Sequence, residues 1–259
     1  MKKTLHQSHK KHPHVKSHKF VRGGKNAFLL PDAKQHSLLY HLPFSEKLFP
    51  YVQLARWERP IGWQLLLWPC LWGLMLANLH GAESRQDFLI QNSFYSIIFV
   101  FGAIFMRGAG CVWNDIVDRE VDARVIRTKQ RPLACGRVSV KQALCFIFLQ
   151  MAISCLLLLC FNPFSIFLAL TSLLLVVFYP FAKRFTHWPQ LVLGLVFNWG
   201  ALLGWSAKMA SLSLAPFLLY IGAVCWTIGY DTVYAHMDKK DDLALGIGST
   251  ALLWGEKTK

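Results

Sequence analysis

The chain has 259 residues, of which 54% are apolar, and its formal net charge at pH 7 is +14. No Asp or Glu occurs between Asp122 and Asp231, although a soluble domain of that size would need carboxylates on its surface. This composition excludes an ordinary water-soluble domain. The basic residues alternate with apolar segments, so the headgroups of membrane lipids fit them better than nucleic acid does.

Residues 1–50 are polar and rich in Lys and His, with no acid before Asp32. We expect a disordered basic tail, because the His residues lack a partner framework for a metal site. The tail has no apolar core typical of a signal peptide, and with Arg22 as its only arginine it is a weak transit peptide. Residues 51–259 are expected to form one membrane domain.

Six apolar segments, each long enough to cross a bilayer as a helix, follow the tail. Their predicted ranges are 61–79, 94–113, 142–160, 163–181, 190–206 and 214–235. The predicted fold is therefore an all-α, polytopic transmembrane bundle. With the N-terminus inside, every Lys and Arg falls on the inner side except Arg85, Arg107 and Lys208, as the positive-inside rule requires.

The first acidic cluster contains Asp115, Asp118 and Asp122, at positions i, i+3 and i+7. On a helix these three side chains share one face, where like charges repel each other. A bound cation would relieve the repulsion, and oxygen ligands favour a hard ion such as Mg²⁺. The simpler interpretation of this cluster alone is a solvated loop.

A second cluster repeats the arrangement with Asp231, Asp238 and Asp242 at i, i+7 and i+11, and with Asp241 alongside. Both clusters follow predicted spans and lie on the same side of the membrane. We therefore predict a pair of Mg²⁺ sites that together bind one diphosphate.

Basic residues near these clusters are candidates for binding the diphosphate oxygens that the metals leave bare. Arg127 and Arg131 lie between the clusters, and Arg can bind a phosphate in bidentate fashion. Lys183 and Arg184 are further candidates, although positive-inside loop charge explains them equally well. Arg59 precedes the first span and could instead be a snorkelling anchor.

Three ordered motifs resemble the UbiA-type family of intramembrane aromatic prenyltransferases. They are NDxxDxxxD at 114–122, RTxxRPLxxG at 127–136 and YDTxYAxxDxxDD at 230–242. The resemblance runs from about residue 42 to the C-terminus. Within the family, the match looks closest to members that act on 4-hydroxybenzoate.

The resemblance implies a helical bundle whose central cavity opens laterally to lipid. It also implies Mg²⁺-dependent transfer of a polyprenyl group from polyprenyl diphosphate to the ring carbon ortho to the hydroxyl of 4-hydroxybenzoate, in ubiquinone biosynthesis. The residues that match the motifs are then the catalytic carboxylates Asp115, Asp118, Asp122, Asp231, Asp238 and Asp242. All of them except Asp231, which opens the second motif, would also bind the metal. Asn114 and Tyr234, inside the motifs, are implied substrate contacts.

Three alternatives stay open at this point. The acceptor could be another aromatic compound, such as homogentisate or a naphthoate. A transporter could place carboxylates along an ion pathway, although these lie at span ends among basic residues. Members of the family continue with further spans beyond the second motif, so we expect a C-terminally incomplete bundle here, which could be an inactive remnant. The expected location is a bacterial inner membrane, with the mitochondrial inner membrane as the alternative.

Overall fold

The computed structural model describes residues 47–80, 85–237, 239, 243–244, 246 and 248–255. The predicted disordered tail lies outside these residues, except at its end, where α1 already begins at Phe49. Within the described part of the chain all regular elements are helical. They are α1 (Phe49–Leu54), α2 (Ile61–Asn78), α3 (Arg85–Val117), α4 (Arg119–Asp122), α5 (Val140–Leu158), α6 (Pro163–Phe185), α7 (Pro189–Asn198), α8 (Gly200–Met209), α9 (Leu214–Ala235) and α11 (Thr250–Trp254).

Five segments of the described chain are long and apolar enough to cross a membrane: Gln86–Val117, Val140–Leu158, Pro163–Phe185, Pro189–Met209 and Leu214–Ala235. They correspond to five of the six predicted spans. The remaining one, 61–79, forms α2, which has the expected position but carries polar residues in its first and last turns. The protein is an all-helical, multi-span membrane protein, and the predicted fold class is confirmed.

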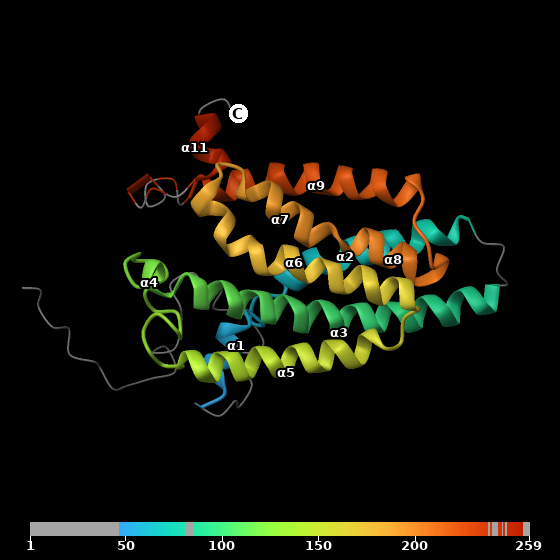
Figure 1. Ribbon diagram of the computed structural model, residues 1–259, viewed down its shortest axis with the longest axis horizontal. Helices are drawn as coiled ribbons and strands as arrows, with labels where there is room; N and C mark the ends of the chain where they lie inside the picture. Colours follow the sequence, from blue (N-terminus) through green and yellow to red (C-terminus); the bar gives the residue numbers. More distant parts are fainter. Residues whose placement is uncertain are drawn as a thin grey trace, which may run out of the picture.

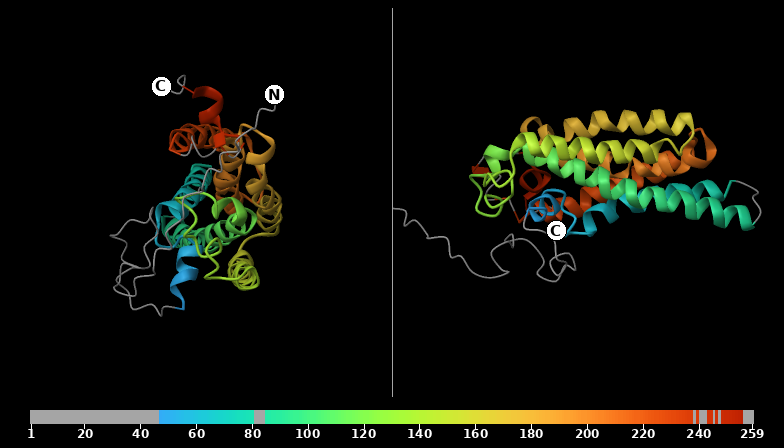
Figure 2. Two further views of the ribbon diagram at one scale, coloured as in Figure 1. Left: turned by 90° about the vertical axis from the view of Figure 1, so that its left-hand side faces the viewer. Right: turned by 90° about the horizontal axis from the view of Figure 1, so that it is seen from below.

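The long helices run side by side along the length of the molecule (Figure 1). The largest interhelical contacts pair α2 with α8, α3 with α5, and α7 with α9. The end-on view shows α5 at the edge of this arrangement, beside α3 (Figure 2). Many apolar side chains on the outward faces are exposed, such as Phe148 on α5 and Leu174 on α6, as expected for surfaces that contact lipid tails.

Two of the helices begin with strong local signals. Ser139 and Gln142 form a capping box at the start of α5, with reciprocal side-chain to backbone hydrogen bonds. Asn162 caps α6, and Pro163 occupies its first turn, where a missing N–H costs nothing. Both caps satisfy backbone N–H groups that would otherwise have no partner at a helix start.

The connection between α3 and α5 folds back over one end of the bundle. Its Leu133 and Val138 are buried against Leu54 and Val112. The Thr128 hydroxyl donates a hydrogen bond of 3.0 Å to the carbonyl oxygen of Asp122. This packing holds the connection next to the end of α3, in the same region as α4 and α11 (Figure 1).

Candidate active site

Three buried carboxylates mark the end of α3. Asp115 lies in the last turn of α3, Asp118 lies between α3 and α4, and Asp122 ends α4. Their exposed fractions are only 1%, 2% and 6%. Helical backbone bonds continue from one to the next, because the N–H of Asp118 donates to Asn114 and that of Asp122 donates to Asp118. The three therefore stay on one side of the chain despite the break between the helices.

Two arginines surround the first and last of these carboxylates. Nη2 of Arg56 lies 2.8 Å from Oδ1 of Asp115. Nη1 of Arg131 lies 3.2 Å from the same oxygen and 2.8 Å from Oδ2 of Asp122. Arg56 adopts a positive φ of 58°, a conformation that costs energy outside glycine and is common at functional sites. The two arginines come from distant parts of the chain and meet at one carboxylate.

The middle carboxylate is bound by the end of α6. Nζ of Lys183 donates to Oδ2 of Asp118, and Nη2 of Arg184 lies 3.5 Å from Oδ1 of Asp118. Nη2 of Arg184 also donates a 2.9 Å hydrogen bond to the carbonyl oxygen of Val117. These contacts join the first acidic motif to a helix that begins far along the chain.

Burial and neighbouring charges change the pKa of two residues at this site. Burial raises the pKa of Asp122, and the charges of Asp115 and Asp118 raise it further, while Arg131 opposes the shift. For Arg56, burial alone would lower the pKa, but the neighbouring Asp115 carboxylate helps to give a net rise. Arg56 therefore stays charged, and Asp122 holds its proton more readily than a free aspartate.

The donor atoms of the site fit a hard cation. Oδ2 of Asp115 and Oδ1 of Asp118 are buried and accept no hydrogen bond from the described residues, and the nearest cation to the Asp118 oxygen is Arg184 at 3.5 Å. Buried carboxylate oxygens that accept no hydrogen bond leave room for a metal cation, and oxygen is the ligand that Mg²⁺ prefers. The described part of the chain does not group three His, Cys, Asp or Glu side chains into one metal site. Asp238 and Asp242 of the second motif lie outside the described residues.

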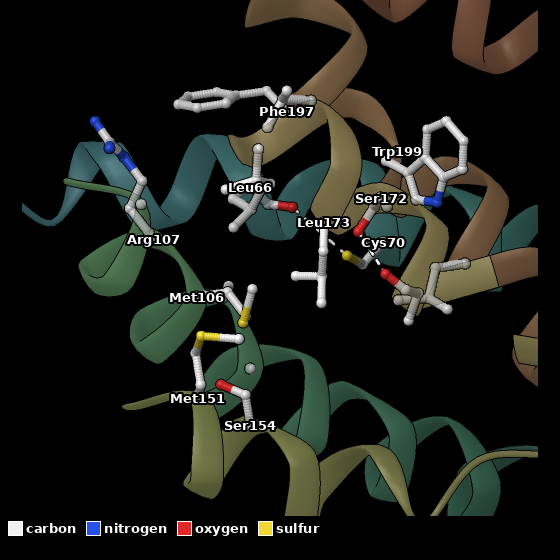
Figure 3. Close-up of a pocket in the computed structure, with 18 of the residues that line it drawn as sticks. Leu66, Cys70, Met106, Arg107, Met151, Ser154, Ser172, Leu173, Phe197 and Trp199 are labelled. Atoms are coloured by element: carbon white, nitrogen blue, oxygen red, sulfur yellow. Dashed lines mark hydrogen bonds between the residues drawn. The ribbon is translucent and has the colours of Figure 1, made fainter. Parts of the chain in front are cut away.

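A cavity of about 440 Å³ extends from Asp115 into the membrane-spanning part of the bundle. Its polar end is lined by Arg56, Asn114, Asp115 and Arg131, and most of the remaining lining is apolar. Figure 3 shows its middle, where Met106 of α3, Met151 of α5 and Leu173 of α6 point toward one another. A volume of this size is typical of a ligand-binding pocket.

One face of α3 forms a wall of the cavity from the polar end to the far end. The lining residues recur at every turn of the helix: Ile98 and Phe99, Gly102 and Ala103, Met106 and Arg107, Gly110 and Cys111, Asn114 and Asp115. A Cβ atom added at Gly102 or Gly110 would have no atom within 4 Å apart from the backbone of its own helix and its chain neighbours. These two glycines therefore leave open space in the cavity, one near each end of the wall.

Arg107 is a charged residue of this wall that the sequence prediction did not include. Its Nη1 donates to Sγ of Cys111, and its guanidinium carbon lies 5.2 Å from the centre of the Phe197 ring. Its Nε is buried without a hydrogen-bond partner in the described part of the protein. A charge inside a membrane span is usually functional, so a single arginine in an otherwise apolar segment was the available signal. Figure 3 shows Arg107 on the same helix as Met106, with its side chain extending toward the Phe197 ring.

The structure brings only part of the predicted set to the cavity. Asn114 and Arg131 line it together with Asp115. Lys183 and Arg184 reach the site through Asp118 but do not line the cavity.

The other predicted residues lie outside the cavity lining. Arg59 lies beside Glu58, with 3.5 Å between Nε and Oε1. Arg127 is an exposed residue of the α3–α5 connection, and Tyr234 is an exposed residue of α9. Asp231, also on α9, is half-buried and does not line the cavity.

The fold and the site together define a membrane protein with a charged carboxylate site at the mouth of an apolar, membrane-embedded cavity. Residues 66–259 match the model of the UbiA prenyltransferase family, and the chain belongs to that family. The predicted family is therefore confirmed.

Named relatives are similar over most of this chain. A protein of Drosophila pseudoobscura pseudoobscura named 4-hydroxybenzoate polyprenyltransferase, mitochondrial, is 50% identical over 232 residues, covering 89% of this chain and 56% of the relative. The human protein with the same name is 47% identical over 213 residues, covering 82% of this chain and 56% of the relative. The chain thus spans little more than half the length of these relatives.

Solved structures agree on the fold. A UbiA homolog from Aeropyrum pernix K1 superposes with a TM-score of 0.62 at 27% identity, covering 75% of this chain and 70% of that one. A UbiA homolog from Archaeoglobus fulgidus, bound to GPP and Mg²⁺, gives a TM-score of 0.56 at 19% identity, covering 81% and 71%. At the lower identity the likeness concerns the fold alone.

Proposed function

We propose that this protein transfers a polyprenyl group from polyprenyl diphosphate to the ring carbon ortho to the hydroxyl of 4-hydroxybenzoate, a step of ubiquinone biosynthesis. The observation that carries the proposal is the cavity that joins a carboxylate and arginine site to an apolar channel inside the membrane. A polyprenyl diphosphate has the same division into a charged head and an apolar chain. The relatives named for this reaction, about half identical in sequence, support the assignment.

The diphosphate is expected at the polar end of the cavity. Arg56 and Arg131 line this end, and each can donate several hydrogen bonds to phosphate oxygens. Asp115 and Asp118 are the described residues that would hold Mg²⁺, each through a buried oxygen without a hydrogen-bond partner. When bound, the metal would neutralise charge that develops on the departing diphosphate. The archaeal relative bound to GPP and Mg²⁺ supports this cofactor.

The acceptor is expected between Arg107 and Asn114. These residues lie seven positions apart on α3, which corresponds to about 10 Å along the helix axis. Gly110 lies between them and leaves open space for a ring. Arg107 is then the cation that binds the carboxylate of 4-hydroxybenzoate, which turns the hydroxyl end of the ring toward the diphosphate site. This assignment gives a partner to the Nε atom that has none in the described protein.

The reaction follows from these positions. The allylic C–O bond breaks and its electron pair leaves with the diphosphate. The ring carbon ortho to the hydroxyl forms the new C–C bond, and loss of the proton from that carbon restores aromaticity. Phe197 and Tyr179 line the cavity, where their faces can stabilise a nearby carbocation, and the apolar wall keeps out the water that would quench it.

The direct test is prenyl transfer in membranes that contain this chain. Labelled 4-hydroxybenzoate and a polyprenyl diphosphate are supplied with Mg²⁺, with and without EDTA, and the labelled lipid is measured. We expect labelled product only when the metal is present. No product, beside an active full-length relative, would contradict the activity and favour an inactive family member. A parallel assay with homogentisate tests the alternative acceptor.

We further propose that the protein resides in the mitochondrial inner membrane. The sequence-based preference for a bacterial inner membrane has no support from the relatives, which are named as mitochondrial proteins. Fractionation of the cells in which this protein naturally occurs would test the location. Recovery of the protein outside mitochondria would contradict it.

A further inference from the structure

Aromatic rings line the end of the cavity farthest from the carboxylates. Phe161, in the turn between α5 and α6, stacks on Tyr95 with ring centres 5.5 Å apart and an interplanar angle of 23°. Its ring centre is also 5.3 Å from that of Phe99. Phe99 and Phe161 both line the cavity. Together these rings form its floor.

The turn that carries Phe161 is firmly anchored. Oδ1 of the neighbouring Asn162 accepts a 2.9 Å hydrogen bond from the N–H of Ser165 and so caps α6. Nδ2 of Asn162 donates to the carbonyl oxygens of Ser206 and Ala207, at 2.8 and 3.2 Å. The hydroxyls of Ser165 and Ser206 lie 2.8 Å apart. The floor is therefore tied to both α6 and α8.

The depth of the channel follows from the wall that α3 forms. Phe99 lies eleven residues from Gly110, so about 16 Å of helix separates the floor from the space assigned to the acceptor ring. An isoprenoid unit adds four chain bonds, which at about 1.5 Å each and tetrahedral angles extend about 5 Å. The channel below the ring then holds about three units.

Gly102 lies partway along this channel. It is eight residues from Gly110, a separation of about 12 Å or about two isoprenoid units. A side chain there would enter open space, because no atom lies within 4 Å of its Cβ position apart from the backbone of its own helix and its chain neighbours. α5 and α6 contribute Cys155 and Leu170, which line the cavity and are exposed.

We propose that Gly102 and Phe161 set how many isoprenoid units of the donor the protein encloses, an inference that rests on the proposed prenyl transfer. Gly102 keeps the channel open beyond the second unit, and Phe161 ends it after about the third. The units of a longer donor lie beyond this channel. Gly102 and Phe161 thus determine whether the third and fourth units of a donor are enclosed.

The first experiment shortens the channel. Membranes with Gly102→Leu receive an equimolar mixture of donors with two and four isoprenoid units, and the two products are quantified by mass spectrometry. Because the leucine fills space needed by the third unit, we expect the ratio of four-unit to two-unit product to fall about tenfold. Transfer from the two-unit donor should persist. Gly222→Leu on α9 is the matched control, since its Cβ position is also open but lies outside the cavity.

The second experiment removes the floor. Phe161→Ala should raise the ratio of four-unit to two-unit product, because the fourth unit gains enclosed space. Phe148→Ala is the control, since Phe148 is an exposed residue of α5 that does not line the cavity. Opposite shifts in the two variants, with neither control shifting, would support the proposal.

The outcomes separate this inference from the proposed function. An unchanged product ratio in both variants, with transfer intact, overturns the proposed role of Gly102 and Phe161 and leaves the proposed prenyl transfer standing. Loss of both products in Gly102→Leu, while Gly222→Leu is active, also overturns it. Failure of the unaltered chain to transfer any donor overturns both the proposed function and the proposed role of Gly102 and Phe161.

Discussion

At the carboxylate end of the cavity, cationic side chains from three parts of the chain surround buried aspartates. At the far end, three aromatic rings pack together on a turn that backbone caps and hydrogen bonds hold in place. Ion pairs therefore define the first end of the cavity, and the packing of aromatic rings defines the second. Changes at the charged end should therefore affect every donor equally, whereas changes at the far end should depend on donor length.

The largest effect is expected from Asp118→Asn. This change keeps the side-chain shape but removes the charge that Lys183 and Arg184 bind and an oxygen suited to a metal. We expect transfer to fall by at least about 100-fold with donors of every length, because charge stabilisation at the leaving group is lost.

Initial rates of transfer with short and long donors measure this effect. Glu120→Gln is the control, because it neutralises an exposed carboxylate two residues away. If Asp118→Asn retained full activity, Asp118 would not belong to the site.

Gly110→Val should come next, and it separates the two ends of the cavity. The added side chain fills the space assigned to the acceptor ring, so transfer should fall by about 10- to 100-fold for donors of two and four units alike. Gly102→Leu, in contrast, should affect only the longer donor. A competition assay with both donors, with Gly222→Val as the control, makes the comparison. A length-dependent loss in Gly110→Val would show that the ring lies elsewhere.

Arg107→Met should raise the KM for the acceptor and leave the KM for the donor unchanged. Loss of the guanidinium removes a charge-assisted bond to the carboxylate, which is worth about 1.5–3 kcal/mol, or roughly 10- to 100-fold in the KM for 4-hydroxybenzoate. The KM for the donor should be unchanged. Steady-state kinetics with each substrate varied in turn measure both values, and equal rises in the two would argue for a structural role instead.

The same contrast explains what could be read from the sequence. Asp115 and Asp118 stand out because charges are rare in an apolar chain, and their spacing places them together. The six apolar segments gave the fold class for the same reason. Arg107 carried the same signal, but its position within a span suggested no partner until the cavity was known. Cavity position could not be inferred for Arg59 or Tyr234, because sequence spacing does not show which face of the bundle a residue reaches.

The residues at the far end of the cavity form no comparable pattern in the sequence. Glycine occurs at 17 positions, and nothing in the sequence separates Gly102, which opens the channel, from Gly222, which faces outward. Phe161 is one of 19 phenylalanines, and its role depends on Tyr95 and Phe99, which are distant in sequence. Shape arises from contacts between helices, so it becomes visible only when the helices are packed.

The smallest effect is expected from Asn162→Ala, which loosens the floor without changing its rings. The change removes the cap of α6 and two hydrogen bonds to α8, and loss of a cap alone costs about 1 kcal/mol. Thermal unfolding of the detergent-solubilised protein should therefore show a Tm lower by a few degrees. The ratio of four-unit to two-unit product should move in the same direction as in Phe161→Ala, but less far, because the Phe161 ring is retained on a less rigid turn.

Ser139→Ala is the control for this prediction. It removes the equivalent cap from α5 at the opposite end and should lower the Tm without moving the ratio. A ratio that moved equally in both variants would mean that general stability, and not the position of Phe161, governs donor length.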